Sequence, residues 1–232
     1  MLGTRCVITI DGLASSGKST LASLLAKRTG FVHINTGLVY RALGLLAIEA
    51  KSDLDDTLQI CRLLDQNQLT FAKKSGGEVV ILINGELPKR SLFDPEISEA
   101  SSRASRHAEV RQRLLAMQRE AFPGESLVVE GRDAGTVVFP GAPLKFFIEA
   151  DPEVRASRRL SQLKESGTAA KCLKREIERE ISDRDRRDQN RPVAPTLAAA
   201  DAIIIDNSAE TLTTIVENMY DFVSKRGLLK SK

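Results

Sequence analysis

The sequence contains few of the residues on which several protein classes depend. Among its 232 residues there is no Trp, and aromatic residues make up only 4%. Proteins that bind single-stranded nucleic acid stack bases on aromatic side chains, so this composition argues against that function. The three cysteines, Cys6, Cys61 and Cys172, are widely spaced, which argues against a disulfide framework or a structural zinc site. We therefore expect a reducing, cytoplasmic location.

Long hydrophobic runs and an excess of one charge are also absent. The first apolar run, Cys6–Ile10, stops at Asp11, too early for a signal-peptide core, and no later run reaches membrane-spanning length. Lys and Arg number 34 against 31 Asp and Glu, which gives a net charge of only +3. This balance predicts no general attraction to nucleic acid or membranes, so any anion site must be local.

The alternation of apolar patterns predicts one α/β domain over 1–232. The length suits a single core, and helical patterns at 20–29 and 40–50 follow short apolar runs. Strand and helix in alternation indicate a parallel sheet with helices on both faces. The five predicted strands are Val7–Ile10, Phe31–Ile34, Leu127–Val129, Leu144–Ile148 and Ala202–Ile205.

A different pattern interrupts this alternation at about 66–91. Leu69–Phe71 and Val79–Ile83 are strand-like; a Gly76-Gly77 turn separates them and an Asn84-Gly85 turn follows the second. We expect a small antiparallel insertion here, between core segments 1–65 and 92–232.

Capping residues mark the starts of three helices. Asp94 and Asp151 each precede a proline that would occupy the first helical position. Asn207, with Glu210 three residues later, predicts the start of the C-terminal helix. The densely charged segment 171–191 ends near two prolines, which indicates an exposed helix that runs into a mobile loop.

Residues 12–19 match the pattern G-x-x-x-x-G-K-S/T of a phosphate-binding loop. The segment follows a predicted strand and opens a predicted helix, as such a loop requires, and this context disfavours an ordinary glycine-rich turn. Lys18 would neutralise the β- and γ-phosphates of ATP, and the Ser19 hydroxyl would ligate Mg²⁺. The predicted ATP-binding residues are Gly12, Leu13, Ala14, Ser15, Ser16, Gly17, Lys18, Ser19 and Thr20.

Such a loop does not by itself separate kinases from switches or motors. Three further segments carry groups suited to anions: TGLVYR at 36–41, GRDAGT at 131–136, and RDRRDQNR at 184–191. Here the sequence resembles bacterial cytidylate kinases, whose patterns are T/S-G-x-x-Y-R, D-G-R-D-x-G-T-V-V-F-P and R-D-x-R-D-x-N-R-x-V-A-P. The resemblance covers nearly the whole chain and implies the P-loop fold of nucleoside monophosphate kinases.

The resemblance also implies the roles of individual residues. Arg41, Arg132 and Arg191, with Thr36, would clamp the substrate's monophosphate, and Arg184 would belong to a mobile lid at about 160–195. Guanidinium groups suit this task because they bind phosphate through two hydrogen bonds. The expected catalytic groups are Lys18, Arg132, Arg184 and Arg191.

Four further positions match the family's contacts to the nucleoside. Ser102, Arg111 and Asp133 match residues that read cytosine, and Asp188 matches a contact to the sugar. The residues alone leave other interpretations open. Arg132 and Asp133 could form a salt bridge within their loop, and Ser102 and Arg111 could lie on an exposed helix.

The late arginines have a second interpretation as a solvated helix face. Arg184 with Asp188, and Asp183 with Arg187, have the i,i+4 spacing of helical ion pairs. Arg184, Arg187 and Arg191 could also share one face of a helix. A phosphate-binding loop on the same chain favours the functional interpretation.

The sequence departs from the family pattern at a few positions. Leu13 replaces a usual Pro, Asn35 and Glu130 replace Asp, Ser19 replaces Gly, and Pro192 replaces Ala or Glu. None of these changes removes a residue with an expected substrate contact. Glu130 ends an apolar run, either as a carboxylate near Mg²⁺ or as the charged end of a core strand.

The resulting hypothesis is a monomeric enzyme that passes a phosphoryl group from ATP, with Mg²⁺, to CMP or dCMP. Because the acceptor oxygen is already anionic, such a reaction needs positioning and charge neutralisation rather than a strong base. Two alternatives remain open: a P-loop kinase for another small acceptor, and a nucleotide-dependent regulatory switch.

Overall fold

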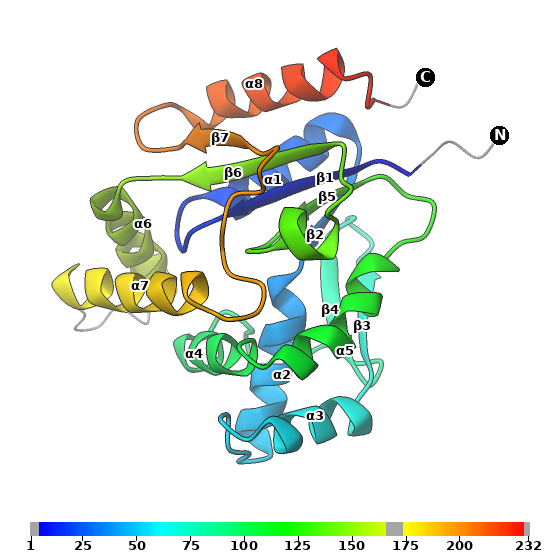
Figure 1. The fold of residues 1–232 in the computed structure, drawn as a ribbon, viewed down its shortest axis with the longest axis vertical. Helices are drawn as coiled ribbons and strands as arrows, with labels where there is room; N and C mark the ends of the chain where they lie inside the picture. The colour runs from blue at the N-terminus through cyan, green and yellow to red at the C-terminus, as the bar shows by residue number, and fades with distance from the viewer. Residues whose placement is uncertain (1–4, 166–173, 230–232) are drawn as a thin grey trace.

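The computed structural model describes residues 5–165 and 174–229, and its centre is a five-stranded parallel sheet (Figure 1). The strand order is β2-β5-β1-β6-β7, with Ile8 of β1 paired with Val128 of β5 and Leu144 of β6. The strands are β1 Val7–Gly12, β2 Val32–Asn35, β5 Leu127–Glu130, β6 Leu144–Glu149 and β7 Ile203–Asp206. All five predicted strands are confirmed, within one or two residues at their ends.

One face of the sheet is covered by α1 (Lys18–Thr29) and α8 (Leu212–Lys225). Ile8 and Phe146 point to this side and form a buried apolar cluster with residues of both helices. Because successive residues of a strand point to opposite faces, neighbours such as Val7 supply a second cluster on the other side. The central strands β5, β1 and β6 are buried on both faces almost throughout, as their nearly unbroken apolar runs predict, whereas residues of the edge strand β7 alternate between half-buried and exposed.

The other face carries a larger set of elements. The second cluster joins β2 and β5 to helices α2 Gly37–Glu49, α3 Thr57–Gln66, α4 Pro95–Ala104 and α5 Ala108–Arg119. A two-stranded antiparallel sheet of β3 (Leu69–Lys73) and β4 (Val79–Ile83) packs into the same cluster through Phe71 and Ile81. The antiparallel insertion predicted from the sequence is therefore confirmed.

The charged segment forms a helix that packs against its predecessor. Helices α6 (Pro152–Glu165) and α7 (Lys174–Gln189) lie together, and Ile177 and Ile181 of α7 are buried between them. The expectation of an exposed helix is correct only in part: most residues of α7 are exposed or half-buried, but Ile177 and Ile181, four residues apart, bury one side of it. The start of the predicted segment, with Cys172, lies outside the described residues.

The cap predicted at Asn207 is also wrong. Helix α8 begins after Thr211, whose hydroxyl accepts a hydrogen bond from the N–H of Thr214. Asn207 is buried, and its side-chain amide donates instead to the carbonyl of Ser16, 2.7 Å away. Within the described ranges, no helix is long and apolar enough to cross a membrane.

Helices α2 and α4 pack closely at Gly44 of α2. A Cβ at this position would lie 2.9 Å from the backbone N of Ser101 and 3.2 Å from the carbonyl O of Ile97, both in α4. Helix α4 also carries Ser102, so this contact fixes one wall of the cavity described below.

We expect Gly44→Ala to destabilise the fold by about 1–3 kcal/mol, because α4 must move away to accept the methyl group. Gly76→Ala is the matched control, since nothing lies within 4 Å of a Cβ there. Denaturant unfolding measures both changes. An unchanged unfolding midpoint for Gly44→Ala would show that α4 is not held at this distance.

Candidate functional site

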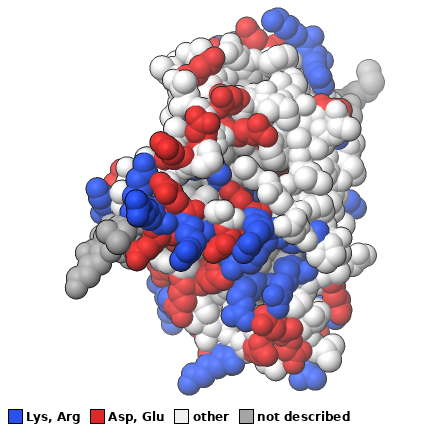
Figure 2. Space-filling model, turned by 60° about the vertical axis from the view of Figure 1, so that its left-hand side comes forward, with Lys and Arg blue, Asp and Glu red and all other residues white. Residues whose placement is uncertain are grey.

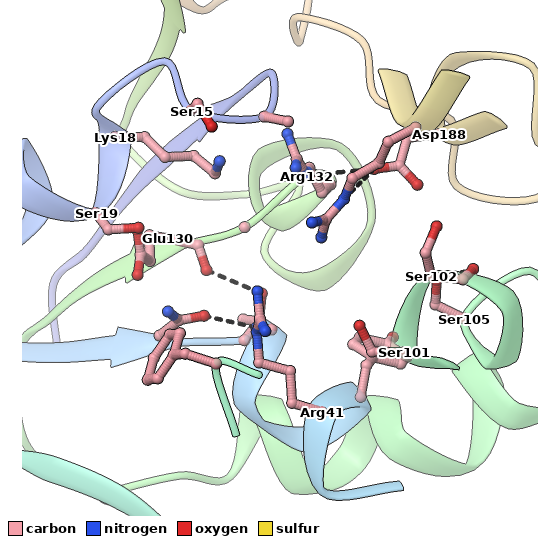
Figure 3. Close-up of a pocket in the computed structure, with 18 of the residues that line it drawn as sticks. Ser15, Lys18, Ser19, Arg41, Ser101, Ser102, Ser105, Glu130, Arg132 and Asp188 are labelled. Atoms are coloured by element: carbon pink, nitrogen blue, oxygen red, sulfur yellow. Dashed lines mark hydrogen bonds and ion pairs between the residues drawn. The ribbon is translucent and has the colours of Figure 1, made fainter. Parts of the chain in front are cut away.

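A cavity of about 750 Å³ opens beside the carboxyl ends of β1, β2 and β5. Ligands of open α/β sheets bind at this edge, where loops and helix N-termini converge. Figure 3 shows Lys18, Arg41 and Arg132 around one space, with Ser101 and Ser102 of α4 on its far side. The predicted site residues that line the cavity are Ala14, Ser15, Gly17, Lys18, Ser19, Thr20, Thr36, Arg41, Ser102, Arg111, Arg132, Asp133, Arg184, Asp188 and Arg191.

The other three predicted residues, Gly12, Leu13 and Ser16, form the backbone of the loop itself. A Cβ on Gly12 would lie 2.3 Å from the carbonyl O of Ile148, so the loop leaves β1 at a point where a side chain does not fit. Gly17, with a φ of 88°, occupies the left-handed region and caps α1. The N-terminus of α1 therefore faces the cavity and favours anions there.

Residues outside the motif brace this loop. The carbonyl of Ser16 accepts hydrogen bonds from Asn207 at 2.7 Å and from Arg158 at 3.3 Å. Asp11 accepts from the N–H groups of Ala134 and Gly135, at 2.8 and 2.7 Å, and so holds the turn that follows Arg132 and Asp133. Sequence reasoning missed these contacts, since their partners are far apart in the chain.

Buried positive charge dominates the cavity. Burial and the neighbouring Arg132 lower the pKa of Lys18 to about 7, and burial and Arg184 lower that of Arg41 to about 9. Burial, again with Arg132, lowers the pKa of Arg184 to about 10. These directions mean that burial and mutual repulsion disfavour the positive charges of the site, and a bound anion would offset both effects.

Figure 2 shows Lys and Arg side chains gathered across the middle of one face, interleaved with acidic side chains. Arg159 of α6 lines the same cavity and contributes to the lowered pKa of both Arg41 and Arg184. Arg159 was not predicted from the sequence as a site residue, although Arg155, Arg158 and Arg159 form a basic cluster that could have indicated an anion site.

Asp188 lies among three of the predicted arginines. Its carboxylate is 3.4 Å from Nε of Arg132, 3.9 Å from Nε of Arg184 and 3.9 Å from Nη1 of Arg191. Arg132 also donates to the carbonyl of Gly12, 2.6 Å away, so it connects the phosphate-binding loop to α7. The alternative interpretation of a salt bridge between Arg132 and Asp133 within their loop is wrong, because Asp133 pairs with Arg111 instead.

The helix-face interpretation of the late arginines is correct only in part. The pair Arg184–Asp188 forms, but Asp183 pairs with Arg186, while Arg187 pairs with Glu99 of α4. Helix α7 ends at Gln189, so Arg191 lies beyond it, buried, and donates to the carbonyl of Ala194. The three arginines therefore do not share a solvated face.

Several buried polar residues line the end of the cavity that lies away from the phosphate-binding loop. Arg111 and Asp133 form a buried ion pair, and the Arg111 guanidinium lies 5.0 Å from the centre of the Tyr40 ring. The hydroxyl of Ser102 is buried without a hydrogen-bond partner among the described residues. An exposed helix at Ser102 and Arg111 is therefore wrong, since both side chains are buried and line the cavity.

Glu130 and Ser19 are suited to a magnesium ion. Burial opposes ionisation of Glu130, but the neighbouring His33, Lys18 and Ser19 outweigh it and hold the pKa of this carboxyl below its ordinary value. Its two oxygens lack hydrogen-bond partners within the described part of the chain, with His33 Nε2 3.5 Å from one of them. Mg²⁺ is usually held by one or two carboxylates together with substrate phosphates, so the donor set fits.

Fold and site together define a P-loop phosphotransferase: a strand, a phosphate cradle and a helix, with cations between the cradle and the polar end of the same cavity. The family model for cytidylate kinase matches residues 8–225. The chain belongs to the cytidylate kinase family.

Individual relatives agree with this assignment. The chain is 39% identical to a cytidylate kinase of Pelotomaculum thermopropionicum, covering 94% of this chain and 95% of the relative. It is 38% identical to a cytidylate kinase of Vibrio parahaemolyticus, covering 95% and 96%. A crystal structure of an uncharacterized protein from Eubacterium ventriosum matches with a TM-score of 0.50 and 14% identity, covering 95% and 99%. That last likeness shows the fold alone.

We expect Lys18→Met to remove nearly all phosphoryl transfer, on the order of 10²–10³-fold or more, while the protein becomes more stable. The stability gain has a definite pH dependence. Lys18 titrates at about 7 in the folded protein against 10.5 for a free side chain, so its burial penalty is complete below pH 7. The penalty shrinks as the pH rises from about 7 to about 10.5.

Thermal melting of the wild type and Lys18→Met across this pH range measures the effect. The difference in melting temperature should be largest at the acidic end and decline toward the alkaline end. A constant difference would mean that the Lys18 ammonium is not desolvated in the folded protein.

Proposed function

We propose that this protein transfers the γ-phosphoryl group of ATP to CMP and dCMP, with formation of ADP and the diphosphates CDP and dCDP. The observation that carries the proposal is one cavity with two chemically different ends. The phosphate-binding loop with Lys18 forms one end, and the buried group Ser102, Arg111 and Asp133 forms the other. Half-buried cations, Arg132 and Arg41 among them, lie between these ends, where two sets of phosphates would meet.

The acceptor end is chemically suited to cytosine. This base presents an amino donor beside ring and carbonyl acceptors, and carboxylates pair with that amino group. Asp133 would accept from it, while Arg111 and Ser102 would serve the neighbouring acceptors. Uracil and the purines present other patterns and would leave buried polar groups unpaired, which is costly. The existing Arg111–Asp133 pair orients both groups before the base enters.

The phosphates would be held by groups that already face the cavity. We assign the monophosphate to Arg41, Arg132 and Arg191, with Thr36 beside them, and the sugar to Asp188. Lys18 and Arg184 would neutralise charge that develops on the transferred group, and the attacking phosphate oxygen needs no separate base. Mg²⁺, held by Ser19 and Glu130 together with the ATP phosphates, would neutralise further charge.

Closure of the segment at about 160–195 over the phosphates would exclude water and limit hydrolysis of ATP. Helix α7 supplies Arg184 and Asp188 to the cavity, and this supports a lid role for the segment. Cytoplasmic location and a monomeric state stay predictions from the sequence.

A panel of nucleoside monophosphates, each with ATP and Mg²⁺, tests the substrate. We expect CMP and dCMP to exceed AMP and GMP in kcat/KM, because only cytosine satisfies Asp133 and Arg111 together. Arg111→Met should reduce kcat/KM for CMP by about 10²-fold or more, since it also leaves Asp133 buried and unpaired. Comparable use of a purine monophosphate by the wild type would contradict the proposal.

The arginines of α7 offer a second test with an internal control. We expect Arg184→Met to reduce kcat by several orders of magnitude, as arginines on transferring phosphate do, without lowering the melting temperature, because burial lowers the pKa of Arg184 and its charge therefore costs stability. Arg187→Met removes an arginine of the same helix that pairs with Glu99 on the surface, and it should keep most of the activity. Full activity of Arg184→Met would refute the role of Arg184.

A further inference from the structure

Helices α6 and α7 contribute a buried ion pair that none of the roles above uses. Arg155 of α6 and Asp185 of α7 are each 6% exposed, and they bind each other directly. Neither residue lines the cavity. Replacement of a buried ion pair by apolar residues often leaves stability unchanged or improves it, so stability alone is a weak reason for this pair.

The pair grips the backbone of Ala14 in the phosphate-binding loop. The Ala14 N–H donates to Oδ1 of Asp185 at 2.9 Å, and the Ala14 carbonyl accepts from Nη1 of Arg155 at 3.2 Å. The Nε of Arg155 donates to the carbonyl of Ala150 at 3.1 Å, which ties the clamp to the end of β6. Ala14 is 5% exposed and also packs against apolar side chains of α6 and α7.

The hydrogen bond from Ala14 to Asp185 also affects Lys18, through one shared peptide group. The N–H of Ala14 and the carbonyl of Leu13 belong to the same planar peptide unit. That carbonyl accepts a hydrogen bond from Nζ of Lys18 at 3.0 Å. Asp185 binds one edge of this peptide plane and Lys18 the opposite edge, so together they fix its orientation, and a rotation of the plane would move the ammonium group.

The same aspartate also fixes α7 relative to the loop. Arg184 directly precedes Asp185, and Asp188 follows it by one helical turn, so both depend on where Asp185 is anchored. A shift of α7 would change the separation between Arg184 and Lys18, which lie close enough for Arg184 to depress the pKa of Lys18.

We propose that Asp185 and Arg155 are positioning residues that hold the Leu13–Ala14 peptide and helix α7 in a fixed relation, and so place Lys18 and Arg184 around the transferred phosphoryl group. This inference goes beyond the proposed function, because it applies to phosphoryl transfer to any acceptor. It predicts a loss of kcat, since misplacement by about 1 Å can cost 10²-fold in rate.

Four variants of the full-length protein test the proposal with kcat, KM for ATP and melting temperature. Asp185→Leu removes the acceptor for the Ala14 N–H, and we expect kcat to fall by about 10²-fold with a smaller change in KM. Asp185→Asn together with Arg155→Met keeps an acceptor for that N–H and leaves no buried unpaired charge. This double variant should melt near the wild type and recover part of the lost kcat.

Arg155→Met alone should melt at a lower temperature, because it leaves the Asp185 carboxylate buried and unpaired, and it should reduce kcat. Asp183→Asn is the matched control: it removes a carboxylate two residues earlier on the same helix, where the partner is the exposed Arg186. Its kcat should stay within about twofold of the wild type, because surface substitutions away from buried ion pairs and hydrogen-bond networks usually have small effects.

The proposal is overturned if Asp185→Leu is folded and retains the wild-type kcat, or if its loss of kcat matches the fraction unfolded at the assay temperature. A double variant that loses as much kcat as Asp185→Leu while melting normally would also overturn the role of the Ala14 hydrogen bond. The kcat of each variant is compared with that of the wild type, with the nucleoside monophosphate that the wild type phosphorylates fastest as the acceptor. A failure of CMP as substrate would therefore contradict the proposed function and leave this test intact.

Discussion

Repulsion among buried cations is the constraint on which the rest of this structure depends. Lys18, Arg41 and Arg184 all have lowered pKa values, because burial and neighbouring arginines disfavour their charges. Asp188 compensates only in part, at distances of 3.4 to 3.9 Å from its arginines. The fold has to hold these like charges close together, which costs free energy. Binding of phosphates would offset that cost, because the charges are already in place to neutralise them.

The fold holds these charges by orienting backbone groups from a distance. Asp11 secures the turn after Arg132, Asn207 secures the carbonyl of Ser16, and Asp185 secures the N–H of Ala14. Each of these side chains is buried, so its hydrogen bonds exchange little with water and define one geometry. The cavity is thus built on the ends of rigid elements, and backbone carbonyls orient arginines that line it, such as Arg132 and Arg191.

The sequence alone determined those features whose physics is local. A phosphate-binding loop is encoded in the contiguous segment 12–19. Its glycines are needed for local reasons: a side chain at Gly12 would collide with the backbone of Ile148, and Gly17 adopts a left-handed conformation. The five parallel strands and the antiparallel pair were likewise readable, since apolar runs and turn residues act within short windows. The resemblance added the family, and with it positions such as Ser102 and Arg111 that no local pattern indicates.

Only the tertiary structure decided which charged groups meet. Arg111 pairs with Asp133, 22 residues away, and Arg132 pairs with Asp188. Residues of opposite charge lie nearer to each of them in the sequence, such as Asp133 directly after Arg132. Asn207 has the spacing of a helix cap, but its amide is bound to Ser16, 191 residues away. The reason is physical: an ion pair or a hydrogen bond depends on distance and burial in space, and these are set by the packing of sheet and helices as a whole.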